Sequence, residues 1–224
     1  MKRLIQPSLI IIASMILGSC SKKSQNAIVP VHVVNINGSG YPIVVIGSLT
    51  WTAANYNGPG GVNYDDSTVN VPANGKLYTQ AEANAIILPP GWRLPTLDDF
   101  NRLLASTGVS EPLSGSTTQD GATEVIANGS AVYKLMSKTG WTTQLGNNSI
   151  GFNALPVGYY SRGYYSAQAF QGQGIDALFV SSSNFNGTPL SFDIEQYPTS
   201  NSAGMNNFIV MWNDRGSIRF VKDN

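Results

Sequence analysis

The chain has 224 residues, with 13 basic and 13 acidic side chains, one histidine and one cysteine. Balanced charge offers no basic face for phosphates, so we expect no nucleic-acid partner, and a single cysteine excludes an intrachain disulfide. Charged residues make up only 12% of the chain while glycine is frequent, which is typical of one loop-rich domain with short strands.

The first twenty residues have the pattern of an export signal. Lys2 and Arg3 precede an apolar stretch from Leu9 to Leu17, and small residues lead to Cys20. A cysteine at this point resembles the lipobox of bacterial lipoproteins. The resemblance implies cleavage before Cys20, lipidation of Cys20, and an outer-membrane lipoprotein facing the periplasm or the cell surface. An ordinary signal peptide with a chance cysteine is the alternative.

Three segments follow from this pattern. We expect a signal peptide over 1–19, a lipidated N-terminus and flexible polar tether over 20–30, and a single domain over 31–224. Loss of the signal leaves 11 basic and 13 acidic residues, a net charge of about −2. The apolar stretch is too short to span a bilayer.

The first half of the domain predicts strands followed by helices. Valine, isoleucine and threonine runs between glycine and asparagine turns predict strands over 31–36, 42–47 and 49–56, and 58–75 is predicted to be a loop. A first helix begins after Thr79, whose spacing to Glu82 is that of a capping box, and stops at Pro89.

A second helix is predicted after Thr96, with an apolar face that includes Phe100 and Leu104 and a stop at Gly108. A third, weaker pattern runs from Ser130 to about Lys138. Later strands are predicted over 150–157, 176–181, 190–195, 207–213 and 216–222, the last two forming a hairpin around Asn213–Gly216. Short helices segregated from many strands indicate an α+β fold.

Five segments in chain order then support a family resemblance. They are Trp51 to Asn55, Gly91-Trp92-Arg93-Leu94-Pro95-Thr96, Gly140-Trp141, Gly151 to Gly158, and Ser217 to Lys222. Over about residues 45–223 the chain resembles the Fibrobacter succinogenes major paralogous domain family. This family is similar, more distantly, to the C-type lectin-like fold. The resemblance implies two or three short helices with an antiparallel sheet and long loops.

The same resemblance contains one informative departure. Family members often carry cysteines where this chain has Leu88 and Phe220. Both positions are apolar here, as expected if a disulfide had been exchanged for packing. We therefore expect Leu88 and Phe220 to lie close in space.

Candidate catalytic groups are few, and we expect no enzyme. His32 precedes the family region and lies in a predicted strand, and Cys20 is expected to be lipidated, so neither supports nucleophilic catalysis. Asp193 and Glu195 are two residues apart and share a strand face, which would suit glycoside hydrolysis. A charged, solvent-facing edge strand is the commoner explanation of such a pair.

Calcium is the one candidate cofactor. Trp212-Asn213-Asp214 matches the triplet that supplies calcium ligands in sugar-binding C-type lectins, so Asn213 and Asp214 are candidate metal ligands. No Glu-Pro-Asn or Gln-Pro-Asp partner motif accompanies it. The alternative is a hairpin turn, which prefers the same residues.

A predicted loop carries several tyrosine side chains around one arginine. This cluster is the candidate ligand-binding site: Tyr159, Tyr160, Arg162, Tyr164 and Tyr165. Exposed tyrosine rings stack on sugars or anchor protein interfaces. The alternative is that half of them are core residues. Trp92 is expected to fill the core beside the second helix, and Arg93 to pair with a carboxylate or bind backbone carbonyls.

Together these features predict a lipid-anchored extracytoplasmic protein for non-catalytic binding or adhesion, with a glycan or a protein as its ligand. The first alternative is a structural or interaction component of a cell-envelope assembly that binds no sugar. The second alternative is a carboxylate-based glycoside hydrolase.

Overall fold

The computed structural model of the chain describes residues 32–109, 123–125, 129–161, 169–185, 187–196, 201–206 and 214–224. Several predictions fall outside these residues: the signal and tether, the strand over 207–213, and the site residues Cys20, Arg162, Tyr164, Tyr165 and Asn213. Within the described part, no helix combines the length and hydropathy needed to cross a membrane.

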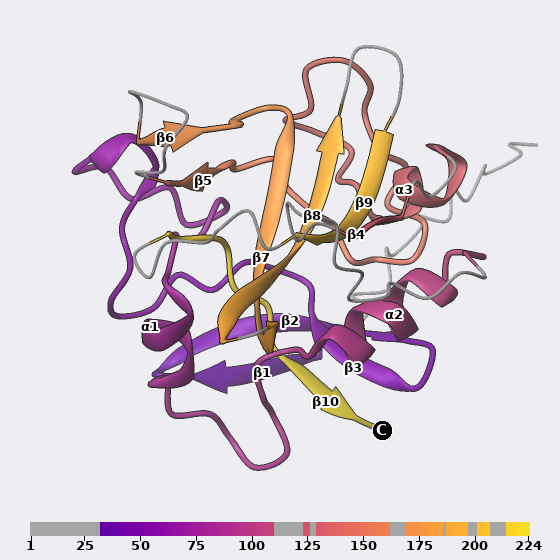
Figure 1. Cartoon of the computed structure of the whole chain (residues 1–224). Coiled ribbons are helices and arrows are strands. Elements are labelled where there is room, and N and C mark those ends of the chain that lie inside the picture. The colour runs from indigo at the N-terminus through magenta and orange to yellow at the C-terminus, as the bar shows by residue number, and fades with distance from the viewer. Residues whose placement is uncertain are drawn as a thin grey trace, which may run out of the picture. The chain divides into compact units, whose positions relative to one another are not determined.

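The described elements are short helices and mostly antiparallel strands (Figure 1), so the predicted α+β class is confirmed. The helices are η1 Tyr64–Asp66, α1 Gln80–Asn84, α2 Leu97–Ala105 and α3 Gly129–Leu135. The strands are β1 Val33–Ile36, β2 Ser39–Ile46, β3 Leu49–Thr52, β4 Thr123–Val125, β5 Tyr159–Tyr160, β6 Phe170–Gln171, β7 Asp176–Phe185, β8 Thr188–Gln196, β9 Asn201–Asn206 and β10 Val221–Asp223.

These strands form two four-stranded sheets and one two-stranded ribbon. The first sheet has the order β1-β2-β3-β10, the second β4-β9-β8-β7, and the ribbon is β5-β6. The turn between β1 and β2 consists of Asn37 and Gly38, both at positive φ, as a tight hairpin turn requires. The three predicted N-terminal strands are therefore present, although β3 ends at Thr52 instead of residue 56.

The closing strand pairs differently from the prediction. We expected it in a hairpin with 207–213, but β10 pairs antiparallel with β3, where Val221 lies opposite Trp51. On its other side, Val221 exchanges backbone hydrogen bonds with Arg93, each 2.9 Å long. Local turn signals cannot reveal such a partner, because it lies far away along the chain.

The capping box predicted at Thr79 is confirmed. The Thr79 side chain accepts a hydrogen bond from the backbone N–H of Glu82, and the Glu82 carboxylate accepts one from the Thr79 N–H. Thr96 and Asp99 repeat this arrangement at the start of α2. The first helix nevertheless ends at Asn84, five residues before Pro89, and the third ends at Leu135.

The predicted strand over 150–157 is wrong. Gly151 and Asn153 adopt positive φ values of 82° and 57°, which breaks any extended run. The carbonyl oxygens of Phe152 and Asn153 accept hydrogen bonds from the Arg219 guanidinium instead of from a neighbouring strand. A side chain thus satisfies the backbone that a sheet would otherwise have paired.

Two apolar clusters form the core. The first contains Trp51, Phe152 and the stacked rings of Phe100 and Phe192, whose centroids are 4.4 Å apart. The second contains Tyr56, Tyr78 and Phe220, and Leu88 packs against it. Leu88 therefore packs against the cluster that contains Phe220, and direct proximity of the two side chains stays a prediction.

Trp92 departs from its prediction. It is partly buried and packs against the second cluster, which includes Ala83 of α1, whereas the buried residues of α2 belong to the first cluster. The expectation that Trp92 fills the core is therefore wrong, and its placement beside the second helix stays a prediction.

Arg219 is fully buried and connects three of the segments that carry the family resemblance. Its guanidinium donates to Asn55 Oδ1 at 2.7 Å and to the carbonyl oxygens of Thr52, Phe152 and Asn153 at 2.8 to 2.9 Å. The same group lies 5.1 Å from the centroid of the Phe152 ring, within the range of a cation–π contact. Burial lowers the pKa of Arg219 to about 9. Since this value is still above 7, the side chain is charged at neutral pH.

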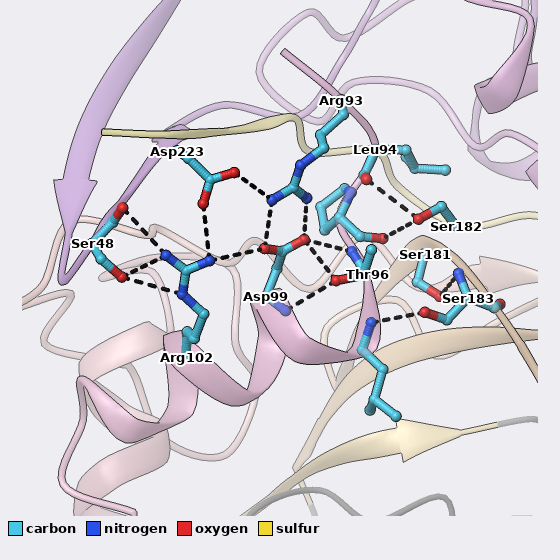
Figure 2. A network of polar contacts seen from close by, with 12 residues as sticks. Ser48, Arg93, Leu94, Thr96, Asp99, Arg102, Ser181, Ser182, Ser183 and Asp223 are labelled. Carbon is cyan, nitrogen blue, oxygen red and sulfur yellow. Dashed lines mark hydrogen bonds and ion pairs between the residues drawn. The ribbon is translucent and has the colours of Figure 1, made fainter. Parts of the chain in front are cut away.

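Arg93 has the role predicted for it. Figure 2 shows its guanidinium between the carboxylates of Asp99 and Asp223, while Arg102 reaches Asp223 and Ser48. Burial opposes ionisation of Asp99, but the hydrogen bonds from Arg93 and from the Thr96 N–H outweigh it and lower the pKa of this carboxyl. This network fastens the start of α2 to the last strand. Arg93, in the Gly91–Thr96 segment of the family resemblance, therefore has a structural role.

Candidate binding site

Three carboxylates lie on one face of the pair formed by β7 and β8. Asp176 is directly opposite Glu195, and Leu178 is directly opposite Asp193. Opposed residues of an antiparallel pair point to the same face, and alternate residues point to the other. The alternate residues, Phe179 and Phe192 among them, pack in the first core cluster, so the three carboxylates face away from that cluster.

The pair Asp193 and Glu195 does not mark an edge strand. Strand β8 lies between β7 and β9 within its sheet, so the interpretation of these charges as protection of a free edge is wrong. Charged residues in a central strand need another explanation.

Asp176 is the most buried of the three carboxylates, with 6% of its surface exposed. Its Oδ1 atom and the Oδ1 atom of Asp193 are buried without a hydrogen-bond partner. Burial, followed by repulsion from Glu195, raises the pKa of Asp176 to about 7. Burial also raises the pKa of Asp193 well above its ordinary value, with repulsion from Asp176 and Glu195 adding to the effect.

A glycine makes room for the Asp176 carboxylate. Gly172 precedes β7 at a φ of 74°, and a Cβ added to it would overlap Asp176 Oδ2. The backbone N–H of Asp176 also donates to the Gly172 carbonyl oxygen at 2.7 Å. The turn before β7 is therefore built around this acidic side chain.

Tyr159 brings the separately predicted site residues together. Burial raises its pKa to about 12, and the negative charges of four nearby carboxylates add to the effect: Asp176, Asp193, Glu195 and Asp214. The Tyr159 hydroxyl donates to Gln171 Oε1 at 3.4 Å, across the β5–β6 ribbon. Figure 1 shows that ribbon beside β7. We call Tyr159 and these four carboxylates the acidic site.

Further aromatic rings lie on the other face of the ribbon. The Phe170 ring is 5.0 Å from that of Tyr160 and 5.2 Å from that of Tyr64, measured between centroids. Burial raises the pKa of Tyr64, and the charges of Asp65 and Asp176 contribute to the shift. The aromatic group therefore adjoins the acidic site through Tyr64.

A cavity of about 380 Å³ opens next to the turn that leads into β7. Its lining combines the turn residues with two segments of the family resemblance: Asn74, Gly140, Thr142, Leu155, Pro156, Val157, Gln173 and Gly174. The turn that leads into β7 thus lines a recess of mixed polarity.

Of the remaining predicted residues, Asp214 belongs to the acidic site and His32 lies elsewhere. His32 is exposed just before β1, where its carbonyl oxygen accepts from the Ile43 N–H. Asp214 is buried. Across the described ranges, no group of three or more histidine, cysteine or acidic side chains is placed to hold a metal ion. The calcium site therefore stays a prediction.

Sequence reasoning missed Asp176. Its signal was weak: one acidic residue at the start of an apolar strand, with no motif around it. Its importance depends on the register that sets it opposite Glu195.

The model of the Fibrobacter succinogenes major domain family matches residues 44–222, so the chain belongs to this family. No curated protein matches the chain. No solved structure matches it either.

Proposed function

We propose that this member of the Fibrobacter succinogenes major domain family is a lipid-anchored, extracytoplasmic binding protein that recognises a glycan at the acidic site. Its domain would be C-type lectin-like and non-catalytic. The observation that carries the proposal is the face of β7 and β8 on which Asp176 lies opposite Glu195 and Asp193 lies two residues away, with the half-buried Tyr159 within reach of their charges.

Carboxylates and a tyrosine ring together suit a sugar. Ionised carboxylates only accept hydrogen bonds, and sugar hydroxyls donate them. A tyrosine ring provides an apolar surface for the C–H face of a pyranose. Asp193 and Glu195 are partly exposed and can contact such a ligand, whereas Asp176 lies beneath them.

A carboxylate-based glycoside hydrolase is the second candidate. Directly opposed residues have Cβ atoms about 5 Å apart, close to the carboxylate spacing of retaining glycosidases, and a pKa of about 7 would let Asp176 donate a proton. The 6% exposure of Asp176 argues against this role, because a proton donor must reach the glycosidic oxygen.

An envelope-assembly component that binds no sugar is the other alternative. Isolated apolar side chains such as Ile87, 83% exposed, and Val45, 63% exposed, would suit a protein partner. Single exposed apolar residues are common on protein surfaces, so they favour this role only weakly.

The anchor has its own test. Cys20→Ser should release the protein from the membrane fraction of cells that express it, and labelling with a lipid precursor should be lost. Membrane association that survives this substitution would contradict lipidation at Cys20.

The binding test is a glycan and polysaccharide screen with the full chain in detergent, run with calcium and again with a chelator. We expect saturable binding that Tyr159→Ala removes and Tyr159→Phe largely retains, because stacking needs the ring and not the hydroxyl. Absence of binding by folded protein under both conditions would favour the envelope-assembly alternative. Turnover of a bound glycan that Glu195→Gln abolishes would favour the hydrolase.

A further inference from the structure

Three carboxylates of the acidic site, Asp176, Asp193 and Glu195, lack compensating positive charge among the described residues. The buried or partly buried acids that the structure describes outside the site are paired: Asp99 with Arg93, and Glu82 with Arg215 at 2.5 Å. Within the same ranges, no lysine, arginine or histidine forms an ion pair with Asp176, Asp193 or Glu195.

Two buried carboxylate oxygens of the site, one on Asp176 and one on Asp193, also have no hydrogen-bond donor among the described residues. Asp176 is more than nine-tenths buried and its Oδ1 has no hydrogen-bond partner, while its side chain projects to the face that it shares with Glu195. Asp193 has a second buried oxygen without a donor on the same face. Buried polar atoms without partners are uncommon in folded proteins, and each calls for an explanation such as a functional role, a water molecule or a bound ion.

We propose that the acidic site recognises a sugar that carries a free, protonated amino group. This inference rests on the proposed glycan-binding function and specifies the chemical class of the glycan. An ammonium group brings three hydrogen-bond donors and one positive charge, which are the two properties that Asp176 and Asp193 do not receive from the described residues.

Each part of the site has a role in this recognition. Asp193 and Glu195, both partly exposed, accept hydrogen bonds from the ammonium group and from neighbouring hydroxyls. Asp176, with a pKa of about 7, is largely protonated at pH 6; a neighbouring ammonium group favours release of that proton, and Asp176 then contributes negative charge from below. The Tyr159 ring, close to all of these carboxylates, provides a surface for the sugar and a cation–π contact. A neutral sugar would supply donors but would leave the charge uncompensated.

The test compares two matched ligands, a tetramer of glucosamine and the same tetramer with every amino group acetylated. Calorimetric titrations use the full chain in detergent at pH 6, where the sugar amine carries its proton, with a chelator present. We expect the free-amine tetramer to bind at least about tenfold more tightly, and this preference to shrink as salt is raised.

Substitutions locate the preference. Glu195→Gln should remove most of the discrimination between the two tetramers. Asp98→Asn is the control, because it makes the same change of charge at an exposed position in the first turn of α2 and should leave both affinities unchanged.

Equal affinity for the two tetramers would overturn the inference while leaving the proposed glycan binding intact. Absence of binding by folded protein to these and to all neutral glycans would overturn both. Binding that appears only when calcium replaces the chelator, or tighter binding of a lysine tetrapeptide than of the glucosamine tetramer, would also overturn the inference, in favour of a metal site or of a basic protein partner.

Discussion

Replacing Asp176 with asparagine should stabilise the folded protein at pH 8. In the folded protein this buried carboxyl has a pKa of about 7, against an ordinary value of 3.8. At pH 8 it is therefore ionised in an environment that disfavours the charge. Asparagine has nearly the same shape and carries no charge, so it relieves the repulsion with Glu195.

The size of the effect follows from the two pKa values. They differ by about three pH units, and each unit corresponds to about 1.4 kcal/mol. The upper limit is therefore about 4 kcal/mol, and about 2 kcal/mol is expected because Asp193 and Glu195 share part of the repulsion.

The direction of the pH dependence follows as well. Since the folded pKa is raised, the folded state keeps a proton that the unfolded chain releases. The stability from Asp176 is fully present below about pH 4 and is lost as the pH rises through about 7. The Asp176→Asn variant should lack this decline.

Chemical unfolding of both proteins at pH 5, 6.5 and 8, followed by tryptophan fluorescence, measures the effect. The control is Asp65→Asn, because Asp65 is exposed and its φ of 60° is one that asparagine tolerates. We expect this control to change the free energy of unfolding by less than about 0.5 kcal/mol. An Asp176→Asn variant no more stable than the parent at pH 8, or equally pH-dependent, would refute the assignment of an uncompensated charge to this position.

Three further substitutions test the scaffold by thermal or chemical unfolding. Arg219→Met should destabilise the protein by about 3–5 kcal/mol, because buried carbonyl oxygens would lose their donors; a loss under about 1 kcal/mol would contradict this. Thr96→Ala should cost about 1 kcal/mol by removing the cap of α2 while Thr96→Ser retains it, and equal stabilities of the two variants would argue against the cap. Gly172→Ala should destabilise more than Gly187→Ala, since both have positive φ but only the first would meet the Asp176 carboxylate, and equal losses would indicate backbone strain alone.

Sequence alone predicted the features whose causes are local. The capping pairs Thr79–Glu82 and Thr96–Asp99 lie within one helical turn, so both helix starts were predicted correctly. The partner of β10 was not, since Trp51 lies 170 residues away from Val221. The strand expected over 150–157 failed for a related reason, because a distant arginine binds its carbonyl oxygens.

The acidic site was predicted only in pieces. Tyr159, the Asp193 and Glu195 pair, and Asp214 were chosen for three unrelated chemistries, yet the fold gathers them. Aromatic and acidic residue types identified the candidates. Only strand register could show that they belong together and that Asp176 completes them.

The pairing of β10 with β3 also constrains how the protein folds. The first sheet is complete only when Val221–Asp223 lies beside Leu49–Thr52, and Arg219 then binds Asn55 across most of the chain. Contacts so distant in sequence form slowly, because a large loop must close before they contribute. A chain still emerging from the ribosome has no closing strand, so its N-terminal hairpin stays without its final partner until residues 221–223 have been synthesised. Removal of residues 221–224 should therefore prevent the domain from folding, and not merely shorten its C-terminal end.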